Sequence, residues 1–144
     1  LWRLREDISE TISQWTPYKN DISVTVAKVP KLLDAVNREV HKSYPDWEVV
    51  WYGHIGDGNL HLNILKPKTL SIDDFKAQCG RVSESIFDAI AHLDGSVSAE
   101  HGVGTLKAPY LHFTRSSTEI DAMRAIKSVF DPDGIMNPGK VLPT

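Results

Sequence analysis

The sequence predicts an α+β fold in which an antiparallel sheet carries helices on one face. Apolar residues recur at helical spacing in several segments, and two strand-like segments flank a glycine-rich interruption at residues 53–59. So short a connection suits antiparallel pairing, because parallel strands need a crossover of a dozen residues or more. The alternation of helices and strands gives the predicted sheet ferredoxin-like elements.

The first helix is predicted over residues 1–15, because apolar residues stand at positions 1, 4, 8 and 12. The Thr16-Pro17 step ends it, since proline disfavours helical backbone in the residue before it. Residues 21–28 alternate isoleucine and valine with polar residues, which predicts a half-buried strand.

The middle of the chain predicts a helix followed by two strands. Pro30 suits a first helical turn, and residues 31–43 place leucine and valine on one face. Residues 47–52 are rich in strand-forming side chains, and the second strand resumes at residues 60–65.

Helices dominate the remaining prediction. One helix is expected from a capping serine at position 71 to about residue 92, and a last one over 117–130. Between them we expect a short strand at residues 96–99 and a short helix around 106–113. The proline- and glycine-rich tail after residue 134 is expected to be extended.

Composition excludes several classes of function. The chain has 144 residues and a formal net charge of −3, without the basic stripe typical of nucleic-acid binding. No apolar run approaches the roughly 20 residues of a membrane helix. Cys79 is the only cysteine, so an intrachain disulfide and an all-cysteine metal site are excluded.

The segment GHIGDGNLHLN at residues 53–63 is the densest in chemically active side chains. A straight strand would place His54 and His61 on opposite faces, but a turn or bulge at the GDG step can reset the alternation. Asn63 shares a face with His61. Two histidines and a carboxylate are a common catalytic zinc set, with one position open for substrate. The alternative is a glycine-rich hairpin with two unrelated histidines.

A second group is Glu100-His101, between a short apolar strand and two glycines. Glu100 is the obvious third metal ligand. His101 would then be available as a general base, a role that suits its near-neutral pKa. The alternative is a helix-capping glutamate and a surface histidine.

A third group is cationic. Arg5 and Ser9 are four residues apart on the first predicted helix, and Lys19 follows in the next loop. An arginine, a hydroxyl and a lysine can hold a carboxylate. The alternative is a set of solvated charges on a surface helix.

Three segments together resemble a known family. GHIGDGNLHLN (53–63), SAEHGVG (98–104) and DPDGIMNPGKVLP (131–143) are similar to the C-terminal part of the FAD-linked D-2-hydroxyacid dehydrogenases and oxidases. That family includes D-lactate dehydrogenase and the glycolate oxidase subunit. The resemblance covers nearly the whole chain, and it looks closest to the members that act on D-2-hydroxyglutarate.

The resemblance implies roles for the first two groups. His54, His61 and Glu100 match the zinc ligands of the family. Asn63 and His101 match residues at the hydroxyacid end of the substrate, with His101 as the base.

The resemblance also implies roles for the cationic group and the tail. Arg5, Ser9 and Lys19 match positions that hold a distal carboxylate, although Ser9 stands where a threonine is expected. Asn137 and Lys140, in the NPGK segment, are implied as cofactor contacts.

The implied cofactors are FAD and a divalent metal, with zinc first. FAD would be bound mainly by an N-terminal domain that this chain lacks, so residues 1–144 are expected to be the C-terminal substrate- and metal-binding part of a larger two-domain flavoprotein, inactive alone. The implied partners are a small 2-hydroxy acid and an electron acceptor (a flavoprotein, a quinone or a cytochrome). An exposed sheet edge would favour a homodimer.

The expected compartment is the cytoplasm in a bacterium or the mitochondrial matrix in a eukaryote. Two alternatives stay open at this point. The first is the same fold acting on D-lactate or glycolate, and the second is a non-catalytic metal-binding module.

Overall fold

The computed structural model describes residues 2–142, and of Leu4 and Arg5 it describes the backbone alone. The strands are β1 (Tyr18–Ser23), β2 (Val49–His54) and β3 (Asn59–Ile64). The α-helices are α1 (Trp2–Glu6), α2 (Ile8–Ser13), α3 (Val29–Ser43), α4 (Ile72–Ala91) and α5 (Ser117–Phe130). Two short 3-10 helices are η1 (Val26–Lys28) and η2 (Ala108–Phe113).

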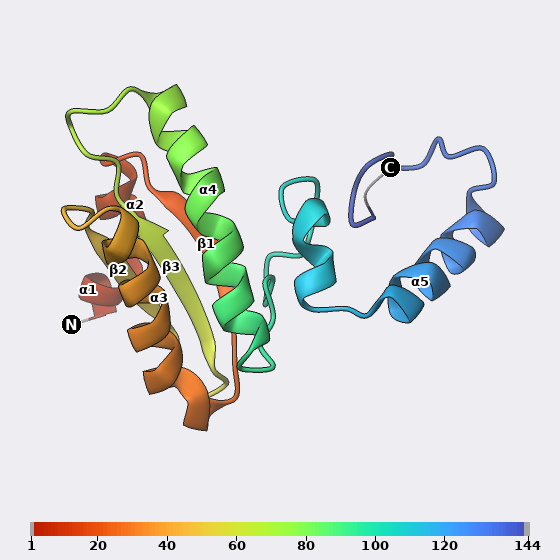
Figure 1. Cartoon of the computed structure of the whole chain (residues 1–144), viewed down its shortest axis with the longest axis horizontal. Helices are drawn as coiled ribbons and strands as arrows, with labels where there is room; N and C mark the ends of the chain where they lie inside the picture. Colours follow the sequence, from red (N-terminus) through yellow and green to blue (C-terminus); the bar gives the residue numbers. More distant parts are fainter. Residues whose placement is uncertain (1, 143–144) are drawn as a thin grey trace.

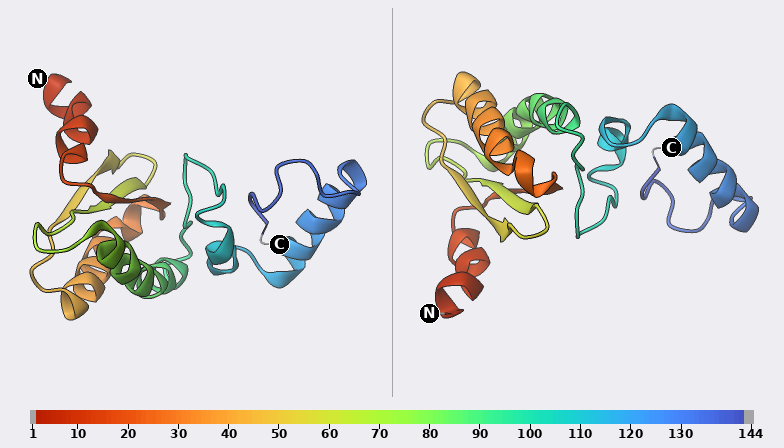
Figure 2. Two further views of the ribbon diagram at one scale, coloured as in Figure 1. Left: turned by 90° about the horizontal axis from the view of Figure 1, so that it is seen from above. Right: turned by 90° about the horizontal axis from the view of Figure 1, so that it is seen from below.

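The three strands form one antiparallel sheet in the order β1-β3-β2. Helices α3 and α4 lie side by side and cover one face of it (Figure 1). Helices α1 and α2 lie on the other side of the sheet, as Figure 2 shows from above and below. The predicted α+β class, with an antiparallel sheet and helices packed on one face, is confirmed.

The hydrophobic core lies between the sheet and the two long helices. The strands contribute Ile22, Leu60, Leu62 and Ile64, α3 contributes Leu32, Val36 and Val40, and α4 contributes Phe75, Cys79, Ile86, Phe87 and Ile90. Every one of these side chains is at least nine-tenths buried. Burying them contributes roughly 1.5–3 kcal/mol for each large apolar side chain, which is what holds the helices on this face.

A fourth strand is reduced to a single bridge. Ser23 and Ser96 exchange two backbone hydrogen bonds, of 3.1 and 2.8 Å, and the Ala99 N–H donates to the Asp21 carbonyl at 3.2 Å. The segment 96–99 therefore runs along the free edge of β1, where the last strand of a β-α-β-β-α-β unit would lie. The prediction of a regular strand there is wrong, although its position beside the sheet is what aims the residues that follow it.

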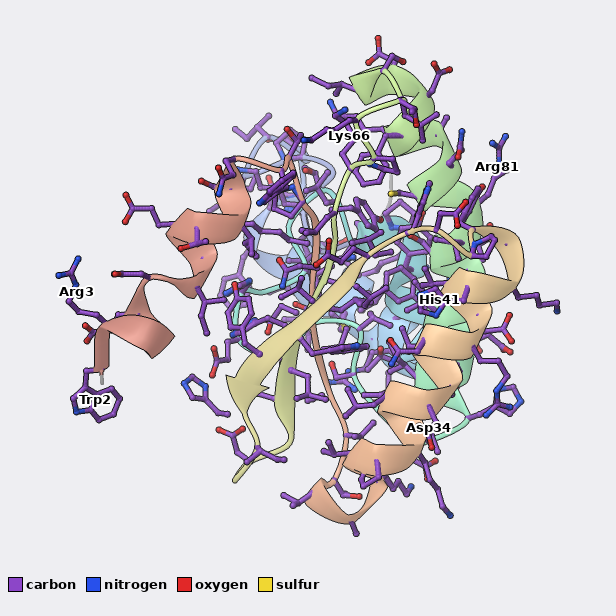
Figure 3. All side chains as sticks on the ribbon, turned by 90° about the vertical axis from the view of Figure 1, so that its left-hand side faces the viewer. Trp2, Arg3, Asp34, His41, Lys66 and Arg81 are labelled. Atoms are coloured by element: carbon purple, nitrogen blue, oxygen red, sulfur yellow. The ribbon has the colours of Figure 1, made fainter. Side chains whose placement is uncertain are left out.

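The first predicted helix and strand differ from the structure. The helix expected over residues 1–15 is broken at Asp7 into α1 and α2, and among its described side chains Ile12 is the buried one. Short helices with little burial are marginal, so packing does not straighten them. Figure 3 shows Trp2 and Arg3 projecting from α1 away from the sheet.

The strand expected over residues 21–28 begins earlier and ends earlier. Tyr18 already pairs with Ile64, while the Val24 N–H leaves the ladder to donate to the Gly58 carbonyl at 3.2 Å. Val26 consequently faces solvent at the start of η1. Lys19 therefore lies within a strand rather than in the predicted loop.

Helix α5 stands apart from the body of the molecule (Figure 1). A capping box holds its first turn: the Glu119 N–H donates to Ser116 Oγ, and the Glu119 carboxylate accepts from the Ser116 N–H. Its apolar residues share one face, yet Ile126, Val129 and Phe130 are exposed and Ile120 alone on the helix is buried. The short helix predicted at 106–113 is the 3-10 helix η2, and Leu106 is exposed.

Within residues 2–142, we find no helix that is both long enough and apolar enough to cross a lipid bilayer.

The turn between β2 and β3 provides a first test. Gly58 has φ +76°, and an added Cβ would lie 1.8 Å from the Val24 carbonyl oxygen. We expect Gly58→Ala to lower the free energy of unfolding in urea by about 2 kcal/mol or more, because it combines backbone strain with a clash against the Val24 backbone, just after β1. Gly56→Ala is the matched control, since an added Cβ there meets nothing within 4 Å. Equal stability of the two variants would contradict this account of the turn.

Candidate functional site

The polar side chains of the sheet gather on the face opposite α3 and α4. In β3, His61 lies directly opposite Asp21 of β1 and Tyr52 of β2, while Asn63 lies opposite Lys19. Directly opposite residues of antiparallel strands point to the same side. Because the alternate residues of these strands enter the hydrophobic core, these polar side chains share the face on which α1 and α2 lie (Figure 2).

The hairpin turn brings His54 onto this same face. Residues 55–58 form a four-residue connection, so that His54 pairs with Asn59 and is in phase with His61. Asp57 closes the turn, since its Oδ1 accepts the Asn59 N–H at 2.9 Å. The GDG step therefore resets the strand alternation, as the sequence analysis predicted.

The Glu100 carboxylate lies between the two imidazoles. Its Oε1 is 3.1 Å from His54 Nδ1, and its Oε2 is 4.0 Å from His61 Nε2. The structure thus brings together the three residues predicted as metal ligands. Within the described residues, the candidate metal ligands whose atoms lie within 4.8 Å of one another form two groups: His54, Asp57 and Glu100, and Asp21, His61 and His101. Two imidazoles and one carboxylate are the donor set of a catalytic zinc site with an open position, and His54 and Glu100 are both about half exposed, so the donor chemistry of the three predicted ligands fits such a metal.

His101 belongs to the same group. Its ring stacks on that of His61, with centroids 5.3 Å apart and planes 12° from parallel. Its Nδ1 lies 3.9 Å from Asp21 Oδ2, and the side chain is 68 % exposed. The predicted base therefore lies beside the predicted metal ligands with most of its ring open to solvent.

Asp21 is a buried carboxylate at the centre of the site, 6 % exposed. Its Oδ2 accepts the backbone N–H groups of Glu100 at 2.6 Å and His101 at 2.7 Å. Its Oδ1 accepts the Asn59 amide at 2.9 Å and lies 3.4 Å from His61 Nδ1. Burial raises the pKa of this carboxyl, but the hydrogen bonds from His101, Asn59 and Glu100 outweigh burial and hold the pKa below its usual range.

His61 is largely buried between these groups. Burial lowers the pKa of its imidazole, and the Asp21 carboxylate opposes that shift without cancelling it. His61 is therefore neutral at pH 7, which is the form that coordinates metal ions.

Two of the three residues of the predicted cationic group are in contact in the structure. Lys19 Nζ donates to Ser9 Oγ at 3.3 Å, which links β1 to α2. Lys19, Asp21 and His101 line one pocket of about 380 Å³. Arg5 lies in α1, and its side chain is outside the described residues.

Asn63 is fully buried beside His61. Its Nδ2 donates to the His61 carbonyl at 3.2 Å, while its Oδ1 has no hydrogen-bond partner in the described part of the chain. A buried acceptor without a partner is costly, and this oxygen is the unpaired polar atom of Asn63.

Asn137 and Lys140 lie elsewhere. They line a second pocket, of about 570 Å³, formed by α5 and the tail, and Lys140 Nζ lies 3.3 Å from Asn137 Oδ1. Figure 1 shows this tail on the side of the molecule away from the sheet. The structure does not bring these two residues to the group around Glu100.

Comparison of the sequence with known proteins identifies one family and several relatives within it. The family model for FAD linked oxidases, C-terminal domain, matches residues 1–141. The chain belongs to this family. It is 60 % identical over 141 residues to a protein of Stutzerimonas stutzeri (strain A1501) named D-2-hydroxyglutarate dehydrogenase, covering 98 % of this chain and 30 % of that protein.

Relatives in eukaryotes are more distant. A Danio rerio protein named D-2-hydroxyglutarate dehydrogenase, mitochondrial, is 39 % identical over 144 residues, covering 99 % of this chain and 26 % of that protein. A Schizosaccharomyces pombe protein named as a putative mitochondrial D-lactate dehydrogenase is 36 % identical over 154 residues, covering 97 % and 28 %. The chain spans less than a third of the length of these members of the family.

Sequence reasoning missed two residues beside the site of this FAD-linked oxidase domain. The sequence places Asp21 at the start of a strand, and its position out of phase with the apolar Ile22 and Val24 puts its carboxylate on the same sheet face as His61. Lys107 gives no such signal. It lies over the Phe87 ring, 4.4 Å from the centroid, and hydrogen-bonds to Asn20 Oδ1.

Lys107 allows a test of buried charge near the site. Burial lowers the pKa of its ammonium group to about 8, from an ordinary value of 10.5. Between these two pH values the unfolded chain binds more protons than the folded one, so the stability conferred by this position rises with pH. We expect the free energy of urea unfolding of the parent chain to rise by roughly 2–3 kcal/mol relative to Lys107→Met between pH 8 and pH 10.5.

The comparison with Lys107→Met removes the contributions of all other groups, since both proteins contain them. Methionine keeps an unbranched apolar chain over the Phe87 ring. If the free energies of unfolding of the two proteins change in parallel across this pH range, the pKa of Lys107 is not lowered in the folded protein.

Proposed function

We propose that this chain is the substrate- and metal-binding part of an FAD-dependent dehydrogenase that oxidises a D-2-hydroxy acid, D-2-hydroxyglutarate, to the 2-keto acid. The observation that carries the proposal is the Glu100 carboxylate, which lies between His54 and His61 with His101 stacked alongside. Membership of the family supports the reaction class, and the relatives named for D-2-hydroxyglutarate support the substrate.

His54, His61 and Glu100 would hold a divalent metal, with zinc first. A metal bound there would lower the pKa of a substrate hydroxyl beside it. His101 would accept that proton, a role supported by the stacking of its ring on His61 and by its place in the lining of the pocket. Asn63 Oδ1 supplies a further hydrogen-bond acceptor at the hydroxyacid end.

The far end of the substrate would be held by cations. Lys19 and Ser9 are already in contact, and Arg5 joins them in the proposal from its place on α1. A dicarboxylate needs such a group, whereas D-lactate has a methyl group at that end. Holding both ends of the substrate fixes the orientation of its C2 atom and can supply several kcal/mol of the barrier.

We assign FAD to a part of the polypeptide N-terminal to this chain, and the chain's 30 % coverage of its D-2-hydroxyglutarate dehydrogenase relative is compatible with a further domain. FAD when bound supplies the two-electron acceptor. In the α5 pocket, Lys127 is paired with Asp131 at 2.5 Å and Lys140 lies against Asn137, so its cations are engaged within the chain. We keep the contact of Asn137 and Lys140 with FAD as a proposal. The use of a flavoprotein, quinone or cytochrome as electron acceptor and the formation of a homodimer are further predictions.

Metal content tests the ligand set. In the purified chain, elemental analysis is expected to find about one transition metal per molecule, and His54→Ala and Glu100→Ala are each expected to lose it. The matched control is His92→Ala, since His92 is also an exposed histidine beside a carboxylate, 3.3 Å from Asp88, but lies on α4. Metal retained in both ligand variants would remove these residues from the proposal.

Substrate selectivity tests the cationic group, in the complete polypeptide with its FAD. We expect Lys19→Met to lower kcat/KM for D-2-hydroxyglutarate by roughly 10- to 100-fold, because it removes a charged hydrogen bond to the distal carboxylate. The value for D-lactate should change little. Lys31→Met, an exposed lysine on α3, is the control. Equal losses with both substrates would contradict the dicarboxylate assignment and favour D-lactate or glycolate.

A further inference from the structure

Asp21 lies against both imidazoles that the proposed function uses. Its Oδ1 is 3.4 Å from His61 Nδ1, and its Oδ2 is 3.9 Å from His101 Nδ1. Each histidine therefore turns the same ring nitrogen, Nδ1, toward the same carboxylate. His61 Nε2 is directed toward Glu100 Oε2, on the far side of its ring.

An ionised carboxylate has lone pairs and no proton to donate. The Asp21 carboxylate accepts the backbone N–H groups of Glu100 and His101 and the amide of Asn59, so its two oxygens act as hydrogen-bond acceptors. A neutral imidazole beside it is stabilised when Nδ1 carries the proton, because two facing lone pairs would repel each other. The Nε2 lone pair of each ring is then available.

We infer that Asp21 is a positioning residue that selects the Nδ1–H tautomer of both His61 and His101, which leaves Nε2 of His61 for the metal and Nε2 of His101 for the substrate proton. The inference rests on the proposed metal site and proton transfer. The same carboxylate accepts the backbone N–H groups of Glu100 and His101, so Asp21 also positions the backbone of these two residues.

The substitution Asp21→Asn separates this role from a structural one. An asparagine Oδ1 can still accept the backbone N–H groups of Glu100 and His101. Its Nδ2 would replace the oxygen that faces Asn59 and His61 Nδ1. Asn59 can rotate its amide to match, because its own Oδ1 has no hydrogen-bond partner in the described part of the chain. The fold is thus retained, while the group beside His61 changes from acceptor to donor.

The first readout is the tautomer itself, measured without metal. In the full chain labelled with 15N-histidine, two-dimensional long-range 1H–15N spectra at pH 8 distinguish a protonated ring nitrogen from a bare one. The parent protein is expected to show Nδ1–H for His61 and His101. Asp21→Asn is expected to shift His61 to Nε2–H. Signals are assigned from their loss in His61→Gln and His101→Gln.

The second readout is the affinity for Zn²⁺, measured by competition with a chromophoric chelator. Asp21→Asn is expected to weaken binding by about 10- to 100-fold, the usual effect of removing a partner of a ligating histidine. The matched control is Asp131→Asn, another buried carboxylate that accepts two backbone N–H groups, from Ile135 and Met136, at the other end of the molecule. It should leave the affinity unchanged.

The outcomes are distinguishable. An Nε2–H tautomer of His61 in the parent protein overturns the inference, whether or not the variants fold. An unchanged tautomer or an unchanged Zn²⁺ affinity in Asp21→Asn overturns it as well. If the parent chain binds no Zn²⁺, the proposed metal site fails, and the tautomers still decide whether Asp21 selects them.

Discussion

The candidate site depends on one buried charge. A carboxylate inside a protein is costly unless its lone pairs are met by hydrogen-bond donors, and Asp21 obtains its donors from two directions. The Asn59 amide comes from the neighbouring strand, and two successive backbone N–H groups come from the segment that follows the reduced fourth strand. The charge therefore determines the path of that segment, and with it the place of Glu100. An apolar residue at this position would remove both the cost of burial and the acceptor that holds the two backbone N–H groups.

The sheet supplies the second constraint. Each strand offers alternate residues to its two faces, so the apolar residues that enter the core fix which polar residues face the other way. Packing of α3 and α4 on one side thus secures the register of His61 and Asn63 on the other. The four-residue turn after His54 keeps the two strands of the hairpin in phase. The packing of β3 into the core therefore also fixes the positions of the site residues on its other face.

The predictions from sequence are confirmed where the residues of a periodic apolar pattern are buried in the core. Helices α3 and α4 follow their apolar stripes and their capping signals closely, and the glycine-rich segment is a turn that places His54 and His61 on one face of the sheet, one of the two arrangements that the sequence allows. The approach of Glu100 to those histidines was inferred from residue type and from resemblance, because no local pattern encodes a contact between residues 46 positions apart.

The errors have physical causes as well. The strand boundary at β1 moved because Tyr18 finds a partner in β3, a long-range pairing that composition does not reveal. The sequence does not distinguish Lys107, a half-buried lysine over an aromatic ring, from a surface lysine. The apolar side of α5 suggested a core contact, yet most of it faces outward in this chain.

That arrangement of α5 has a consequence for how the molecule opens. A helix of this length that buries a single side chain depends on local hydrogen bonds and its serine cap rather than on the core. Its backbone amides can exchange with solvent through local unfolding, while those of β3 and α4 must wait for the core to open. The chain therefore contains two regions of different cooperativity. His61 on β3 belongs to the slower region, so α5 at the other end of the molecule can unfold and refold without opening the sheet.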